Sequence, residues 1–477
     1  MSMGSSPRLS TQRARKRHVF VGAVLHLKKG FSAEKKGFSA EASATTAAVV
    51  AMKSAAITRL AALLCLSIDH AVAHTRADKP KVPLSASSRW ILDAAGQRVK
   101  LRCINWAGHL EANIPEGLHK QSIEHTADWI ASQGFNCVRL TYSTDMARHP
   151  DVRVEDSFRS AAKAAGVEEK ALMRLYAAAV EKNPFLVNAN VSSTVLDVFD
   201  RVQGALWDRG VMTVLDNHVS RAGWCCDLND GNGWWKDARF YMAENSRFFD
   251  TGEWRAGLGA MAMWSRSRPG IVGLSLRNEL RASFAQIPFA AETWLSYMPP
   301  AAQLVHDANP DALVVVGGIN GGTDLTPLRL VPMMDLGTWG GKRVWEAHSY
   351  SFTMTTPNFG ICPLAKAQYG GLYGFVLEQG RPHTGPLFLS EFGVGMTGGP
   401  RDGLSDKDGR YLTCLAEYMA GNDADWALWA IQGSYYVRGK TVDHNETWGA
   451  LDYDWRDWRN PKFKAMLGSM VNVTQGP

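Results

Sequence analysis

The chain has 477 residues, a length that could hold several domains, although an α/β barrel routinely reaches about 250 residues or more as a single unit. Its formal net charge is +6, and the basic excess lies in the N-terminal segment. Residues 1–51 contribute +7 and residues 52–73 contribute +1, which leaves −2 for the remainder. A basic excess confined to the N-terminus excludes a nucleic-acid-binding surface on the rest of the chain.

Residues 1–73 have the composition of a processed leader. Residues 1–51 are basic and repeat KKGFSAE in tandem, so we interpret them as a disordered leader that is absent from the mature protein. Residues 52–73 combine Lys53 and Arg59 with an apolar core and a small-residue end, as in a secretory signal peptide; a buried helix is the alternative. We therefore expect a secreted, extracellular or cell-wall protein with no membrane span in its mature chain. A linker at 74–84 would precede a single folded domain at 85–477.

Six cysteines follow the signal, and an even number in an exported chain allows disulfides. We predict a bridge between Cys362 and Cys414, which both fall beside helices late in the chain. Cys103 and Cys137 lie in apolar, strand-like runs and are expected to be small buried hydrophobic residues. Cys225 and Cys226 are adjacent, and the sequence does not identify their partner. No second Cys or His pair stands at metal-ligand spacing, so we expect no metal and no cofactor.

The sequence also contains Asn-X-Ser/Thr sequons, at Asn190, Asn445 and Asn472. In an exported protein these asparagines are candidate glycosylation sites. We expect all of them to lie at the surface.

Strand-like and helix-like runs alternate from residue 99 onward. The predicted strands cover residues 99–105, 135–141, 211–217, 271–277, 312–317, 343–349, 386–390 and 425–430. The predicted helices cover residues 120–133, 194–208, 253–266, 292–308, 365–379 and 408–420. This alternation predicts the α/β class and a (β/α)8 TIM barrel in a single catalytic domain, with long βα-loop insertions at 142–193 and 219–250.

Two of the predicted strands lead into a glutamate. The apolar run 270–276 is followed by Asn278 and Glu279, and the run 386–390 is followed by Glu391. Burying an unpaired carboxylate is costly, so such a group must be hydrogen-bonded, exposed in a cleft or shifted in pKa. For Asn278 and Glu279 taken alone, a polar cap at the strand end is the alternative. In a parallel barrel both strand tips reach the same edge, which suits glycoside hydrolysis by a pair of carboxyl groups.

Other strand ends carry Arg139, His218, His348, Tyr350 and Trp429. Together with Asn278, Glu279 and Glu391, and in this order along the strands, they resemble the signature of glycoside hydrolase family 5, the cellulase family of clan A. The resemblance covers about residues 85–470 and shows no departure at these positions. The segments LDNHVS, GWCC, DGNG, SLRNELR, SEFG, DWALW and GSYY are similar to a plant and fungal branch of that family.

The resemblance implies two catalytic residues. Glu279 would be the general acid and base, held beside His348. Glu391 would be the nucleophile, kept ionised by Arg139 and the Tyr350 hydroxyl.

It also implies substrate contacts around them. Asn278 would donate to the sugar 2-hydroxyl, Trp429 would stack beneath the sugar ring and His218 would orient the site. Asp216 and Glu346 lie deeper on the same strands, and we expect them to be interior partners of the site.

The loop that contains DGNG also holds Trp224, Trp234 and Trp235. Aromatic residues in such a glycine-rich loop are poorly suited to a core, so we expect them to be sugar-binding platforms. Packing is the alternative.

We expect a monomeric, secreted, retaining β-glycoside hydrolase that binds a glucan-type or mannan-type polysaccharide or oligosaccharide. Its carboxyl groups would lie about 5 to 5.5 Å apart, whereas a separation of about 9 Å would indicate inversion. One alternative is a glycosidase of small glycoconjugates such as glycolipids or aryl glycosides, with the insertion at 142–193 closing one end of the cleft. The other is a carbohydrate-binding barrel without activity.

Overall fold

The computed structural model describes residues 79–330, 337–352 and 361–477. The predicted leader, the signal peptide and the first part of the linker lie outside these ranges, so those interpretations stay predictions. Among the described residues, none of the helices has the length and apolarity needed to cross a membrane.

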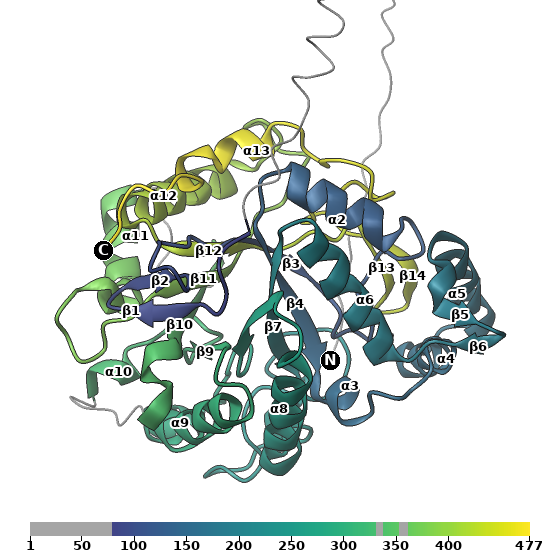
Figure 1. Ribbon diagram of the computed structural model, residues 1–477, viewed down its shortest axis with the longest axis horizontal. Coiled ribbons are helices and arrows are strands. Elements are labelled where there is room, and N and C mark those ends of the chain that lie inside the picture. Colours follow the sequence, from purple (N-terminus) through teal and green to yellow (C-terminus); the bar gives the residue numbers. More distant parts are fainter. Residues whose placement is uncertain (1–78, 331–336, 353–360) are drawn as a thin grey trace, which may run out of the picture. The chain divides into compact units, whose positions relative to one another are not determined.

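Eight parallel strands close into a barrel, which confirms the predicted fold class (Figure 1). In chain order the strands are β3 (Arg102–Trp106), β4 (Cys137–Ser143), β7 (Met212–Val219), β8 (Ile271–Ser275), β9 (Leu313–Gly317), β10 (Arg343–Ser349), β11 (Leu387–Phe392) and β12 (Asp425–Leu428). Each pairs with the next, and β12 pairs back with β3. Every strand overlaps its predicted range, and the largest shift is at the start of β3.

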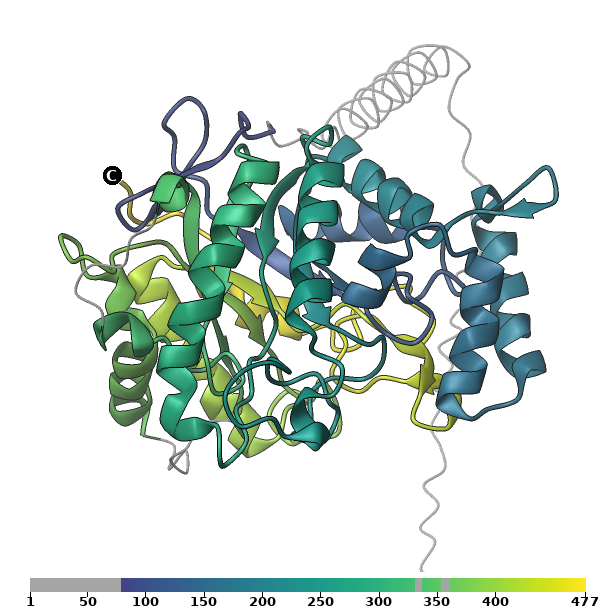
Figure 2. The ribbon, with the colours of Figure 1, turned by 90° about the horizontal axis from the view of Figure 1, so that it is seen from below.

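Helices cover the outside of this barrel, and several run alongside one another in Figure 2. The helices that match the predicted ranges are α2 (Ile123–Ser132), α6 (Val195–Asp208), α8 (Thr251–Ser265), α9 (Ala290–Ala308), α11 (Cys362–Leu372) and α12 (Asp406–Asn422). Side-chain caps begin four of them, α2, α6, α8 and α12. In α6, Thr194 and Asp197 form a reciprocal capping box. The predicted helix 365–379 ends early, because a short 3-10 helix (Gly374–Leu377) replaces its last part.

Apolar side chains fill the end of the barrel at which the strands begin. Val214, Val315 and Phe388 belong to this buried cluster, and Leu84 and Ile91 pack into it from the hairpin of β1 (Ser85–Ser87) and β2 (Trp90–Leu92). Leu84 is therefore part of the folded body although it was expected in the linker. Since this end is filled, a substrate site must lie at the other end, where the strands finish.

The disulfides only partly follow the sequence analysis. The Cys362–Cys414 bridge is confirmed, and it joins α11 to α12. The expectation for Cys103 and Cys137 was wrong: strand register places them as direct partners on β3 and β4, and they form a disulfide. Cys225 and Cys226 are bonded to each other.

The 142–193 insertion consists mainly of three helices, α3 (Thr144–Arg148), α4 (Val154–Ala165) and α5 (Glu169–Lys182), and a small hairpin of β5 (Val187–Asn188) and β6 (Val191–Ser192). Helices α4 and α5 pack against each other and against a hairpin that follows the last barrel strand, β13 (Ser434–Arg438) and β14 (Thr441–Asn445). This contact ties the insertion to the C-terminal part of the chain.

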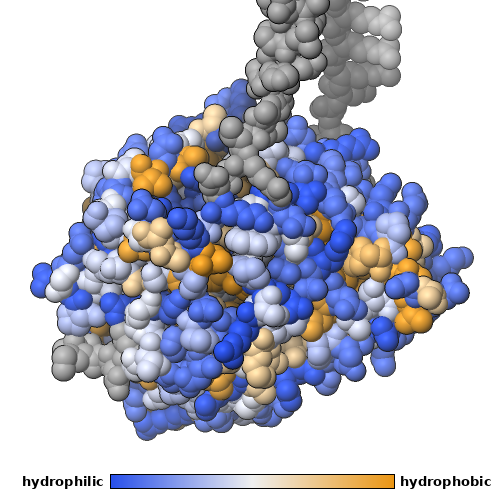
Figure 3. All heavy atoms as spheres, viewed as in Figure 1, coloured by the Kyte–Doolittle hydropathy of each residue, from blue (hydrophilic) through white to orange (hydrophobic). Residues whose placement is uncertain are grey.

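The described surface is mostly hydrophilic on the face drawn in Figure 3, where apolar residues form small separated groups. The sequon residues Asn190, Asn445 and Asn472 are all exposed, as expected. Their glycosylation stays a prediction.

Removing the Cys362–Cys414 bridge should lower the free energy of unfolding by about 2–4 kcal/mol, because the bridge closes a loop between residues that are 52 positions apart. The Cys362→Ala/Cys414→Ala variant and wild type would be compared by denaturant unfolding without reductant. Cys225→Ala/Cys226→Ala is the matched control, since a bridge between adjacent residues closes almost no loop. Equal losses in both variants would contradict the loop-closure account.

Candidate active site

The strand ends surround a cavity of about 560 Å³ at the carboxyl edge of the barrel. Glu279, Glu391, His218, Tyr350 and Trp429 line it. Most of the residues singled out from the sequence thus converge at one place. Arg139, Asn278 and His348 lie directly behind this lining, almost fully buried.

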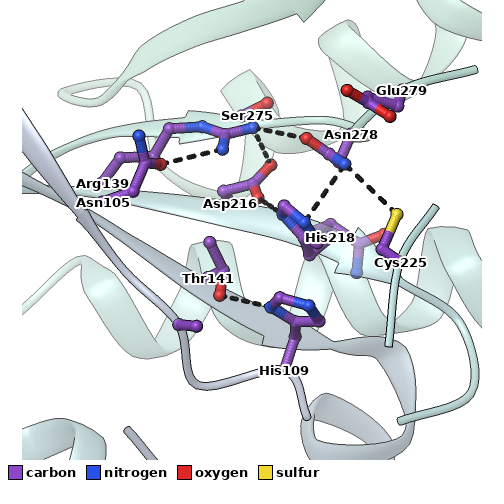
Figure 4. Close-up of polar contacts among 12 residues, drawn as sticks. Asn105, His109, Arg139, Thr141, Asp216, His218, Cys225, Ser275, Asn278 and Glu279 are labelled. Carbon is purple, nitrogen blue, oxygen red and sulfur yellow. Dashed lines mark hydrogen bonds and ion pairs between the residues drawn. The ribbon is translucent and has the colours of Figure 1, made fainter. Parts of the chain in front are cut away.

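Arg139 on β4 is the centre of the site. Its guanidinium is fully buried and contacts three carboxylates, with Nη1 2.7 Å from Glu391, Nη2 2.9 Å from Asp216 and Nε 3.1 Å from Glu346. It also donates to Asn105 and Asn278 (Figure 4). Burial alone would lower the pKa of Arg139, but the three carboxylates outweigh it and raise that pKa. Asp216 and Glu346 are therefore interior partners, as expected.

Glu391 on β11 lies between this guanidinium and a phenol. Its Oε1 accepts from Arg139, and its Oε2 accepts from the Tyr350 hydroxyl at 2.9 Å. Burial raises the pKa of Glu391 to about 7, although His348 and Arg139 both act to lower it. The predicted partners of Glu391, Arg139 and Tyr350, are both present, but burial has the larger effect on its pKa.

Glu279 follows β8 and faces Glu391 across the cavity. Its Oε1 lies 3.0 Å from His348 Nδ1, which is 3.6 Å from Glu391 Oε2. One carboxylate oxygen of each glutamate and a ring nitrogen of His348 all lie within 4.8 Å of one another. Glu279 has a φ of +36°, a backbone conformation that residues other than glycine rarely adopt.

His348 lies between the two glutamates. Burial would lower its pKa, but Glu391 and Glu279 outweigh burial and raise it. A proton on the ring therefore compensates the paired carboxylates.

A second histidine fixes the amide of Asn278. His218 Nδ1 lies 2.6 Å from Asp216 Oδ2 and its Nε2 lies 3.2 Å from Asn278 Nδ2 (Figure 4). Burial holds the pKa of His218 well below its usual value, so the ring is neutral. Since the Asp216 carboxylate accepts a hydrogen bond from Nδ1–H, Nε2 carries no hydrogen. Nε2 is therefore an acceptor, and Asn278 donates to it.

The aromatic residues divide into cavity and core. Trp429, just after β12, lines the cavity and stacks on His218 with ring centroids 5.4 Å apart. Trp224 also lines it, as expected. Trp234 and Trp235 do not: both are fully buried, so the expectation that they bind sugar was wrong.

The physical reason lies in the loop that contains them. Arg277 donates to the carbonyl oxygen of Asn232, and Arg281 makes a two-point ion pair with Asp230. These contacts fold the loop back onto the barrel, and the two tryptophans pack beneath it.

Sequence reasoning missed part of the cavity wall. Arg438 and Glu446 belong to the β13–β14 hairpin and the residue after it, and they form an ion pair at 2.9 Å. The Arg438 guanidinium lies 3.7 Å from the centre of the Trp224 ring. The sequence feature that could have identified them is the strand-like segment that directly follows the last barrel strand. A segment in that position is expected to adjoin the site.

Phe352 and Trp448 also line the cavity, at its Tyr350 side, and were likewise not identified. His109 stacks on His218 with ring centroids 3.8 Å apart. It was not predicted, because it follows the first strand, whose end was not among the strand ends considered for site residues.

Two groups of described residues have the atom types and spacing of metal ligands. In the first, His218 with Cys225 and Cys226, both sulfurs are already joined in a disulfide. In the second, Glu279 with Glu391 and His348, the raised pKa of the histidine favours a proton on the ring and opposes a cation.

Comparison with known proteins gives a consistent result. The family model described as cellulase (glycosyl hydrolase family 5) matches residues 92–434. A "Glycosyl hydrolase 5 family protein" of Chamaecyparis obtusa is 36% identical over 430 residues, which cover 88% of this chain and 70% of that protein. An "Endoglucanase" of Paenibacillus polymyxa is 21% identical over 80% of this chain and 85% of its own.

Solved structures share the fold at low sequence identity. The hyperthermophilic endocellulase from the archaeon Pyrococcus horikoshii has a TM-score of 0.62 and 18% identity, over 83% of this chain and 100% of that one. The catalytic domain of the major endoglucanase from Xanthomonas campestris pv. campestris has a TM-score of 0.60 and 20% identity, over 81% and 99%.

Replacing Glu391 by Gln should stabilise the fold at pH 8, by an amount on the order of 1–3 kcal/mol, and this gain should fade as the pH falls. Burial raises the folded-state pKa from 4.5 to about 7, so the favourable contribution of the carboxyl group is complete below pH 4.5 and is lost as the pH rises through 7. Melting temperatures of wild type and variant from pH 5 to 8 would measure the effect.

Asp443→Asn is the control of opposite sign, because His119 and Lys120 outweigh burial and lower the pKa of Asp443. The stabilisation from that carboxylate is present above its unfolded-state pKa and is lost as the pH falls. A Glu391→Gln gain that does not change between pH 5 and 8 would contradict the raised pKa.

Proposed function

Because this chain belongs to glycosyl hydrolase family 5, the cellulase family, we propose that it hydrolyses β-linked glucans with retention of configuration, through Glu279 and Glu391. The observation that carries this proposal is the short distance between the carboxyl groups, whose facing oxygens lie within 4.8 Å. Inverting enzymes need about 6.5–9.5 Å between the carboxyl groups to admit a water molecule, and retaining ones need about 5–5.5 Å.

In the first step a carboxylate oxygen of Glu391 attacks the anomeric carbon while Glu279 protonates the departing glycosidic oxygen. Arg139 and Tyr350 hold both oxygens of Glu391, so the nucleophile is fixed for in-line attack. The carbon–oxygen bond to the leaving group breaks as the bond to Glu391 forms. The product is a covalent glycosyl-enzyme.

In the second step Glu279, now a carboxylate, takes a proton from a water molecule that attacks the same carbon. The sugar–Glu391 ester bond breaks, which restores both carboxyl groups and gives a product of the original configuration. Glu279 suits both roles because its side chain is 15% exposed, at the cavity, and can exchange protons with solvent. His348 between the two glutamates limits their mutual repulsion.

The cavity walls support a carbohydrate substrate. Trp224, Trp429 and Trp448 offer ring faces, and Arg281, Asn320 and Arg438 offer hydrogen-bond donors. Sugars need this combination, because their C–H faces are apolar and their hydroxyl edges are polar.

A glycoside with an apolar aglycone is the second candidate substrate. Leu228 at the cavity is 56% exposed, and Phe284, two residues beyond cavity-lining Ala282, is 92% exposed. Such an apolar rim favours contact with a non-sugar group. Comparing kcat/KM for cellooligosaccharides, mannooligosaccharides and long-chain alkyl β-glucosides tests this choice: preference for the alkyl glucosides would displace the glucan assignment.

We also propose that the protein is secreted after removal of a signal peptide at 52–73. Three disulfides among the described residues support export, since such bonds persist in oxidising compartments. N-terminal sequencing of the exported protein tests the proposal, and a first residue well before His74 would refute it.

Replacing Glu391 by Ala should abolish hydrolysis of an aryl β-glucoside, with a loss of at least about 10⁴-fold in kcat, because no nucleophile remains. Added azide should restore turnover and give a glycosyl azide of inverted configuration, since the small anion fills the space of the lost carboxylate. Product configuration would be read by NMR.

Glu279→Ala is the matched control. With this variant azide should give a product of retained configuration, because azide then attacks the glycosyl-enzyme. Unchanged activity in Glu391→Ala, or the same stereochemistry in both variants, would overturn the assignment of roles.

A further inference from the structure

The disulfide between Cys225 and Cys226 is not expected to stabilise the fold. It joins adjacent residues, so it closes almost no loop, and both residues are half-buried at the wall of the cavity. Asn278 Nδ2 lies 3.7 Å from Cys225 Sγ (Figure 4). It lies 3.5 Å from Cys226 Sγ, so both sulfurs adjoin the site.

Asn278 has one hydrogen that is not used by a strong acceptor. Its Oδ1 accepts from Arg139 Nη2 at 2.9 Å, which fixes the orientation of the amide. One Nδ2 hydrogen is donated to Nε2 of His218, the acceptor nitrogen of the neutral ring. The second hydrogen is left to face the two sulfurs of the disulfide.

Sulfur is a weak hydrogen-bond acceptor. A weak contact with sulfur can orient the second N–H of Asn278 without forming a strong hydrogen bond. The N–H can then exchange this contact for a hydrogen bond to a substrate hydroxyl oxygen. A carboxylate or carbonyl at the same place would compete with the substrate. The disulfide therefore keeps the second N–H of Asn278 oriented, and little free energy is lost when this N–H binds the substrate instead of sulfur.

The disulfide is itself held from both sides. Arg281 Nη1 lies 3.6 Å from Cys225 Sγ, and Arg281 is fixed by its two-point ion pair with Asp230. On the other side, Trp224 precedes the disulfide and packs under Arg438. The sulfurs are thus fixed relative to Asn278 by contacts that do not involve the substrate.

We propose that the Cys225–Cys226 disulfide is a positioning element of the substrate site, which aims the second N–H of Asn278 at the 2-hydroxyl of the sugar undergoing cleavage. The inference rests on the proposed function, because that function gives Asn278 its hydroxyl partner. The bonded sulfurs also present a compact, polarisable wall beside the sugar. Loss of the disulfide should therefore reduce the benefit that the enzyme gains from the 2-hydroxyl and leave the two glutamates intact.

The experiment compares wild type with Cys225→Ala/Cys226→Ala on two substrates, 4-nitrophenyl β-glucoside and its 2-deoxy analogue. We expect kcat/KM for the 2-hydroxy substrate to fall about 10- to 100-fold, because a small displacement of a positioned donor has effects of this size. For the 2-deoxy substrate, which cannot use the donor, kcat/KM should change less than about threefold.

A double-mutant cycle with Asn278→Ala identifies the route of the effect. If the disulfide acts through Asn278, removing it in the Asn278→Ala background should cost little more. Cys225→Ser/Cys226→Ser tests the sulfurs themselves, and we expect it to behave like the alanine pair. Cys362→Ala/Cys414→Ala, a bridge outside the cavity, should keep the wild-type ratio of the two substrates when assayed below its melting temperature.

Equal losses on both substrates, or additive losses in the cycle, would overturn the inference, because they indicate a general structural role. Melting curves separate that result from misfolding: a variant that melts like wild type and keeps the wild-type substrate ratio also refutes it. Failure of the proposed function is a different result, since wild type itself would then cleave neither glycoside.

Discussion

The site depends on one buried guanidinium, that of Arg139. Its five polar partners are Asn105, Asp216, Asn278, Glu346 and Glu391, which come from β3, β7, the end of β8, β10 and β11. A charge with no exposure to water must be paired, so these strands cannot shift relative to β4 without leaving it unsatisfied. The barrel register and the geometry of the proposed catalytic groups are therefore fixed by the same contacts.

This arrangement has an electrostatic consequence. Arg139 is shared among three carboxylates, so Glu391 receives only part of its charge, and desolvation prevails despite the nearby His348. Glu391, the proposed nucleophile, is therefore close to its protonation threshold near neutral pH, with weakly solvated oxygens. Its charge state therefore depends on that of His348, whose Nδ1 lies 3.6 Å from Glu391 Oε2.

The sequence predicts the strand ends well, because each short apolar run places its last residues at a common edge. Contacts between distant loops are not encoded in this way. Cys103 and Cys137 are paired by strand register, and Trp234 and Trp235 are buried under a loop that Arg277 and Arg281 contact at Asn232 and Asp230. In each case the deciding interaction is tertiary, and local composition favoured another outcome.

The same limit applies to the insertion at 142–193, which in one of the alternative interpretations closed one end of the cleft. Instead it acts through a second element: Phe158 on α4 packs against Tyr436 on β13, and the β13–β14 hairpin places Arg438 at the cavity. Arg438 in turn covers Trp224. Helices α4 and α5, which contribute no residue to the cavity lining, therefore pack against the hairpin that forms this part of the cavity wall.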